Sequence, residues 1–166
     1  MFDKLKIREK VNNIFDLAEK AGTVLLSSPT YLGEVRFELL FFFFFWLDYR
    51  EYFHLGNEIR EKIIDEFLER VSKEFENKDS LKRITILHQQ RINKYFQLSR
   101  SNKTIGEFLE NTSKYIAALA YFFQKEQYPF DKNIENIFNE ISKESVDSLS
   151  KAIAKSIFLH GFYLFY

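Results

Sequence analysis

The nine residues from 39 to 47 contain no charged side chain, and five consecutive ones, Phe41 to Phe45, are phenylalanine. Apart from the indole of Trp46, this segment has no polar side-chain group. A helix with one apolar stripe faces a core on that side only, whereas a helix that is apolar all round must be covered on every side. The segment therefore predicts one helix that is enclosed by other helices, by a partner or by lipid.

The length of this segment argues against lipid. A membrane span needs roughly 20 apolar residues, and nine residues of helix cover only about 14 Å. Charged residues also close the segment on both sides, namely Glu34, Arg36, Glu38, Asp48, Arg50 and Glu51. We therefore expect no transmembrane segment and predict the central helix of an all-α bundle.

Composition is consistent with one helical domain over residues 1–166, since a chain of this length can bury a sizeable core. Lysine plus arginine and aspartate plus glutamate both number 24, so no net charge attracts nucleic acid or anionic lipid. The absence of cysteine excludes disulfides, thiolate metal sites and a thiol nucleophile. Charges near Met1 occupy the position of a secretory apolar region, so we expect a cytoplasmic protein.

Apolar residues recur at helical spacing and predict a bundle of five to seven helices around the aromatic one. The expected ranges are about 3–21, 32–53, 58–75, 80–98, 104–127 and 131–159, and we favour a break of the last near 142–145 over one long helix. Gly22, Gly56 and Pro129 are the expected stops. The residues expected on inward faces or stripes include Leu5, Val11, Ile14 and Phe15 in the first helix, Ile63, Phe67 and Val71 in the third, and Leu81, Ile84 and Tyr95 in the fourth.

Local pairings strengthen two of these helices. Thr104 and Glu107 have the spacing of a capping box, in which two side chains reciprocally satisfy backbone donors at a helix start. Opposite charges four residues apart favour the helix over 58–75, at Glu58–Lys62, Glu66–Arg70 and Glu69–Lys73.

The common nucleotide-binding, hydrolase and metalloprotease motifs are absent, and we expect no cofactor. One pair, Glu51 and His54, has the Glu-x-x-His spacing that supplies two metal ligands in di-iron bundles. Such a site needs a second copy, which the sequence lacks. A zinc site made of His54, His88 and His160 is a further alternative. The competing interpretation makes His88 a neighbour of the core and His54 a helix-end residue.

Basic residues gather between 78 and 103, where seven stand against one acid, Asp79. Four of them, Lys82, Arg83, Arg91 and Lys94, form a predicted basic patch for an acidic partner or for phosphates. Nucleic acid is the less favoured of these, since no reading motif accompanies the patch. Alternatively, the acid-rich segment 58–76 neutralises it from a neighbouring helix. Lys78, Arg100 and Lys103 complete the seven.

The carboxyl-terminal residues 156–166 carry no charge unless His160 is protonated. They predict a docked segment that lies across the bundle, forms a subunit interface or lines an apolar ligand pocket. The candidate residues for such an interface or pocket are Phe41, Phe45, Trp46, Phe158, Phe162 and Phe165.

Taken together, the sequence favours a helical bundle that acts by association, with itself as a homo-oligomer and with an acidic protein partner. A bundle that encloses an apolar small molecule is the main alternative. A metal-dependent enzyme that uses Glu51 and His54 is the third, and an enzyme is less expected than a binding protein.

Overall fold

The computed structural model describes residues 3–23, 32–74, 80–125 and 143–165, and within these ranges the chain is helical with no strand. This confirms the predicted all-α bundle. The α-helices are α1 (Lys4–Thr23), α2 (Leu32–Arg50), α3 (Asn57–Glu74), α4 (Ser80–Ser101), α5 (Ile105–Lys125) and α7 (Lys143–Phe165), and a 3-10 helix, η2, spans Tyr52–Leu55.

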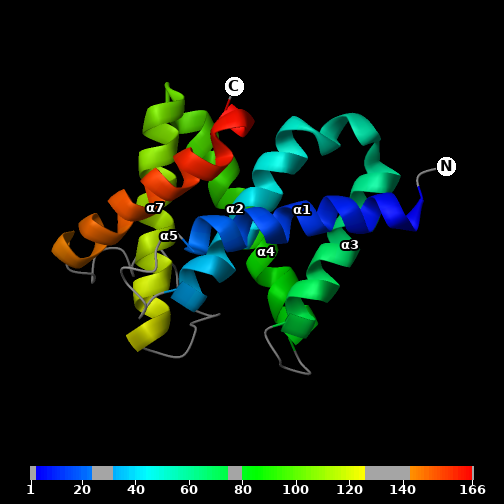
Figure 1. The fold of residues 1–166 in the computed structure, drawn as a ribbon, viewed down its shortest axis with the longest axis horizontal. Coiled ribbons are helices and arrows are strands. Elements are labelled where there is room, and N and C mark those ends of the chain that lie inside the picture. The colour runs from blue at the N-terminus through cyan, green and yellow to red at the C-terminus, as the bar shows by residue number, and fades with distance from the viewer. Residues whose placement is uncertain (1–2, 24–31, 75–79, 126–142, 166) are drawn as a thin grey trace.

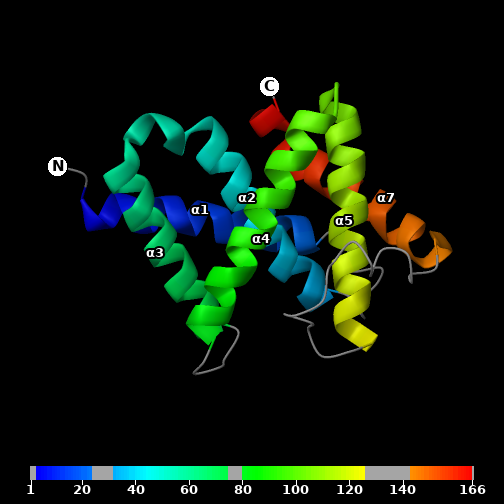
Figure 2. The ribbon, with the colours of Figure 1, turned by 180° about the vertical axis from the view of Figure 1, so that it is seen from behind.

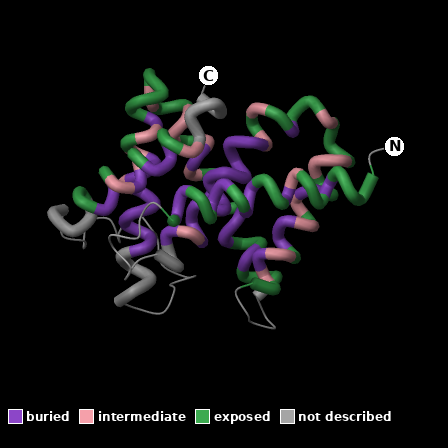
Figure 3. The backbone as a smooth tube through the Cα atoms, in the orientation of Figure 1, coloured by how far each residue is buried: buried purple, intermediate pink, exposed green. Residues whose placement is uncertain are grey.

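The aromatic helix α2 lies at the centre of the bundle. Every residue from 39 to 47 is buried, and Figure 3 shows the buried positions concentrated where the helices cross. Helices α1, α4, α5 and α7 all contact α2. The prediction of one helix covered on every side is therefore confirmed, and its cover comes from this chain.

Helix α1 crosses α2 and packs against it, as Figure 1 shows. Its buried face includes Val11, Ile14 and Phe15, as predicted. Leu5 was expected on the same face, but the structure leaves it exposed because the first turn of α1 extends past its neighbours.

Helix α2 ends at Arg50, three residues before its predicted end, and the chain turns through Glu51 into η2. Gly56 follows with a φ of 84°, a left-handed conformation that favours glycine, and α3 begins at the next residue. Arg60 then donates two hydrogen bonds to the Asp48 carboxylate, at 2.8 and 2.6 Å. This bidentate pair ties the start of α3 to the end of α2.

Helices α3 and α4 pack against each other and diverge from their shared end, as Figure 2 shows. In α3, Ile63, Phe67 and Val71 are fully buried, as the stripe predicts. In α4 the predicted inward residues Ile84 and Tyr95 are buried, whereas the prediction for Leu81 was wrong. Leu81 lies in the first turn of α4 and is about half exposed.

The predicted charge pairs on α3 form in two cases of three. Lys62 donates to Glu58 and Lys73 to Glu69, each at 2.8 Å. Glu66 pairs instead with Arg8 of α1, at 3.6 Å. Arg70 likewise turns toward α1 and lies over the Phe15 ring, 4.0 Å from its centroid. The contact between α1 and α3 therefore competes with the pairing inside α3.

The start of α5 resembles the predicted capping box with one change. The Glu107 amide donates to the Thr104 hydroxyl at 3.1 Å, and the Glu107 carboxylate accepts from the backbone of Lys103, one residue before the expected donor. Helix α7 packs along α5 and also contacts α1, where the buried Ser156 hydroxyl donates to the Ala21 carbonyl. The predicted stop at Pro129 and a separate helix before 142 lie outside the described residues.

Candidate interaction surfaces

Three of the six aromatic residues predicted for an interface or pocket lie inside the bundle. Phe41 and Phe45 are essentially without exposed surface, and Trp46 retains very little. Phe41 packs against Phe67 at 6.0 Å between ring centroids, and the Trp46 ring stacks on Phe108 at 5.5 Å. The chain's own rings cover these three residues, so they offer a partner almost no surface, and their place in an interface or apolar pocket stays a prediction. Spacings of this size also leave no room between these pairs for an apolar ligand.

His88 belongs to this aromatic core. Its ring meets the edge of Phe44 at 4.8 Å and lies 5.7 and 6.0 Å from Phe67 and Phe41. Burial lowers the pKa of His88 from 6.5 to about 4, against the weaker attraction of Asp48. At neutral pH the imidazole is therefore uncharged, which agrees with the predicted position beside the core.

Arg91 and Glu38 form an ion pair that no water reaches. The guanidinium donates to both carboxylate oxygens, at 2.7 and 3.0 Å, and both side chains are fully buried. Burial alone would lower the pKa of Arg91, but Glu38 holds it above its ordinary value, so the guanidinium remains charged. The assignment of Arg91 to an accessible basic patch was therefore wrong, since its charge is neutralised inside the bundle.

Two tyrosines line this pair. The rings of Tyr95 and Tyr115 meet edge to face at 5.8 Å, and the Arg91 guanidinium lies 5.8 Å from the Tyr115 centroid. Burial raises the pKa of Tyr115 to about 12, although Arg91 opposes the shift. Both phenols are therefore protonated at neutral pH. The arrangement joins α2, α4 and α5 through one polar cluster within an aromatic core.

Sequence reasoning missed Glu38, although a signal for its partner was present. Arg91 falls in phase with the inward residues Ile84, Leu87, His88 and Tyr95 of the same helix. A cation on a buried stripe requires a buried anion. Glu38 borders the aromatic run of α2 and was therefore the nearest candidate for that anion.

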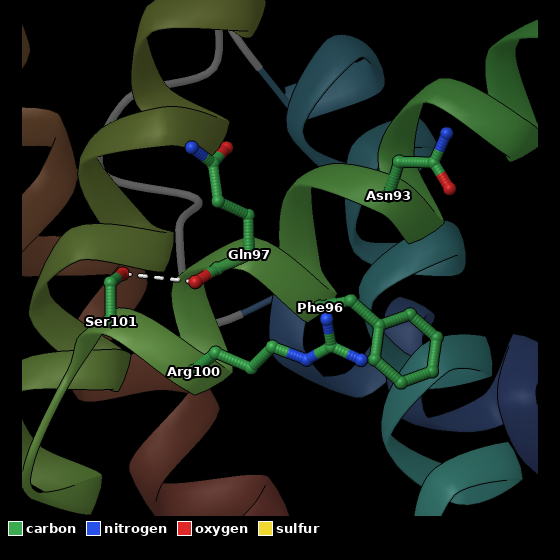
Figure 4. A pocket seen from close by; sticks show the side chains of 5 residues that line it. All are labelled: Asn93, Phe96, Gln97, Arg100 and Ser101. Atoms are coloured by element: carbon green, nitrogen blue, oxygen red, sulfur yellow. Dashed lines mark hydrogen bonds between the residues drawn. The ribbon is translucent and has the colours of Figure 1, made fainter.

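The other members of the predicted basic patch remain on the outside of α4. Lys82 and Arg83 are exposed, and Lys94 is half-buried with its ammonium group 5.9 Å from the Tyr115 centroid. Arg100 extends this surface toward the end of the helix. It lines an open hollow of about 610 Å³ together with Asn93, Phe96, Gln97 and Ser101 (Figure 4).

Two acids of α3 pair with helices other than α4. Glu66 pairs with Arg8 of α1, and Glu74 pairs with Arg36 of α2 at 3.3 Å and with Arg70. The alternative in which α3 neutralises the basic segment therefore receives no support from these pairs.

The metal hypothesis places Glu51 and His54 together on the aromatic α-helix, whereas α2 ends at Arg50, before both of them. Glu51 lies in the turn after α2, and His54 lies in η2 with its ring against Phe53, 5.9 Å between centroids. Across the described ranges, no group of three or more histidine, aspartate or glutamate side chains is placed to hold a metal ion. The three histidines predicted as a zinc site accordingly form no such group, and His88 is enclosed by aromatic rings.

Helix α7 presents apolar side chains to solvent near its end. Phe158 is 45% exposed and Leu159 is 55% exposed, whereas Ile153 and Ile157 face the core. The helix continues to Phe165, but the side chains of Phe162 and Phe165 lie outside the described residues.

Searches for relatives identify no family model, curated protein or solved structure that matches this chain. None of the helices described in the structure has both the length and the hydropathy needed to span a bilayer. The surfaces of α7 and α4 are therefore the basis for the functional argument.

Proposed function

We propose that the protein acts by association, and that its first partner is a second copy bound through the end of α7. The observation that carries this proposal is the pair Phe158 and Leu159, two adjacent large apolar residues that are about half exposed on a helix. Full burial of such a side chain is worth about 1.5–3 kcal/mol, so covering the exposed half of each contributes roughly half of that and favours a covered state.

The closed core supports the choice of this surface. Because α2 is already buried by helices of the same chain, the aromatic run does not require a partner. The end of α7 differs, since Phe158 and Leu159 follow the exposed lysines Lys151 and Lys155 along one side of the helix. An apolar patch with a charged border is the usual anatomy of a protein interface. A two-fold axis beside α7 would bring the same patch of both copies together.

The test is the oligomeric state of the untagged protein, measured by native mass spectrometry and by sedimentation over a wide range of concentrations. We expect a dimer whose fraction rises with concentration. Leu159→Asp should shift the protein to monomer, because two carboxylates would be buried at the axis. Leu5→Asp is the matched control, since Leu5 is even more exposed but lies on α1.

A wild-type protein that remains monomeric at every concentration would refute this proposal. Equal weakening by Leu5→Asp and Leu159→Asp would also refute it, because the effect would then come from charge and not from the α7 surface.

A further inference from the structure

The outward side of α4 carries a second surface, and α4 and α7 both pack against α5 (Figures 1 and 2). Six of its residues follow one another at alternating spacings of four and three, so they lie along one side of the helix. None of the six is buried. We call them the α4 stripe: Lys82, Ile86, Gln89, Asn93, Phe96 and Arg100.

The α4 stripe has a distinct order of chemistry along about 27 Å of helix. Cations lie at its two ends, and the apolar side chains of Ile86 and Phe96 come next. Ile86 is 44% exposed, whereas Phe96 is partly buried, with its ring 5.1 Å from the ring of Phe45, and offers only its remaining surface. In the middle, the Gln89 amide donates to the Asn93 side-chain oxygen at 2.9 Å. From Ser80 to Ser101 the helix contains no carboxylate that could neutralise its cations from within.

The end of the stripe is also hollowed. Asn93, Phe96 and Arg100 line the open hollow, and in Figure 4 the Arg100 guanidinium extends alongside the Phe96 ring. An apolar side chain of a partner would contact the ring there, and a carboxylate would meet the guanidinium in its bidentate geometry. A site of this kind recognises both groups on one ligand.

The spacing and the charge together favour a helical ligand. Alternating steps of three and four match the seam that a second helix packs against. A nucleic acid would need a track of cations, since phosphate contacts dominate its binding, and the α4 stripe places only two at opposite ends. We propose that the α4 stripe binds an acidic amphipathic helix of a partner protein, with apolar residues on Ile86 and Phe96 and carboxylates at Lys82 and Arg100.

This inference concerns a surface other than the end of α7, so it does not depend on self-association. It is tested on full-length Leu159→Asp protein as well as on wild type, which separates the two outcomes. The probe is a synthetic peptide of about 21 residues with leucine at the seam positions and glutamate beside them. A second peptide has lysine in place of every glutamate.

We expect the glutamate peptide to bind, as measured by fluorescence anisotropy. Its affinity should fall as the salt concentration is raised from about 0.1 M to about 1 M. The double variant Lys82→Glu/Arg100→Glu should bind it at least about tenfold more weakly and should prefer the lysine peptide. Ile86→Asp should weaken the binding of the glutamate peptide. The control Lys151→Glu/Lys155→Glu has the same change in charge on α7 and should bind as wild type does.

Three results would overturn the proposal. One is no binding of the glutamate peptide by wild-type protein, and another is equal loss in the α7 control. The third is tighter binding of a single-stranded oligonucleotide of about 20 nucleotides than of either peptide, which would make the surface a nucleic-acid site.

Discussion

Replacement of His88 by leucine should remove a large part of the acid sensitivity of the fold. His88 is buried among Phe41, Phe44 and Phe67, and its pKa falls from 6.5 in the unfolded chain to about 4 in the folded one. Between these values the unfolded chain binds a proton that the native protein does not, so the free energy of unfolding decreases as pH falls. The stability that buried His88 contributes is fully present above pH 6.5 and is lost as the pH falls toward 4.

The size of this effect follows from the pKa difference. Each pKa unit corresponds to about 1.4 kcal/mol, so His88 accounts for a loss of about 3 kcal/mol between pH 7.5 and pH 4. His88→Leu keeps an apolar side chain of similar volume and has no proton to bind. Its advantage over wild type should therefore grow by about 3 kcal/mol across the same interval.

The assay is urea unfolding followed by circular dichroism at several pH values. His54→Leu is the control for the loss of a histidine, because His54 is exposed in η2. If the difference between His88→Leu and wild type stays constant from pH 7.5 to pH 4, the imidazole is not buried in its neutral form, and the argument from burial fails.

Three further perturbations test the packing. Arg91→Met should lower the free energy of unfolding by about 3–5 kcal/mol, because it leaves Glu38 buried without its partner. The double variant Glu38→Leu/Arg91→Met should recover most of this loss. Additive losses in a double-mutant cycle would contradict the pairing. Phe67→Ala should destabilise the fold by about 3–5 kcal/mol in thermal unfolding, since its ring contacts Phe41 and Phe44; a loss below about 1 kcal/mol would mean a looser core. Thr104→Ala should cost about 1 kcal/mol in urea unfolding, and no loss would show that the cap is unimportant.

Hydrophobic pattern was sufficient to predict the bundle and its centre. The run at Phe41 to Phe45 has no polar side, which leaves few arrangements other than an enclosed helix. The same pattern failed at helix ends, where Leu5 and Leu81 are in phase with the core but lie in the first turns of α1 and α4 and stay exposed. Periodicity shows which side a residue faces, whereas its burial depends on how far the neighbouring helices reach.

The candidate surfaces were harder to predict because composition does not distinguish a buried charge from an exposed one. Arg91 was counted with Lys82 in one patch, although the two lie on different sides of α4. The spacing that places Ile86 and Phe96 on the same side of α4 as Arg100 was present in the sequence, but the exposure of that side depends on the packing of α4 against α2 and α5. The exposed Phe158 was predicted as an interface residue, and its function stays a prediction.

The central position of α2 also affects how the chain must behave during its synthesis. Several of the side chains that cover α2 belong to α4, α5 and α7, which all follow it in sequence. Roughly 60 residues separate the end of the aromatic run from the start of α5, and at about 5–20 residues per second a ribosome needs several seconds to make them. At the start of that interval only α1 can cover the apolar segment of α2, which makes a holdase chaperone valuable early in the synthesis of the chain.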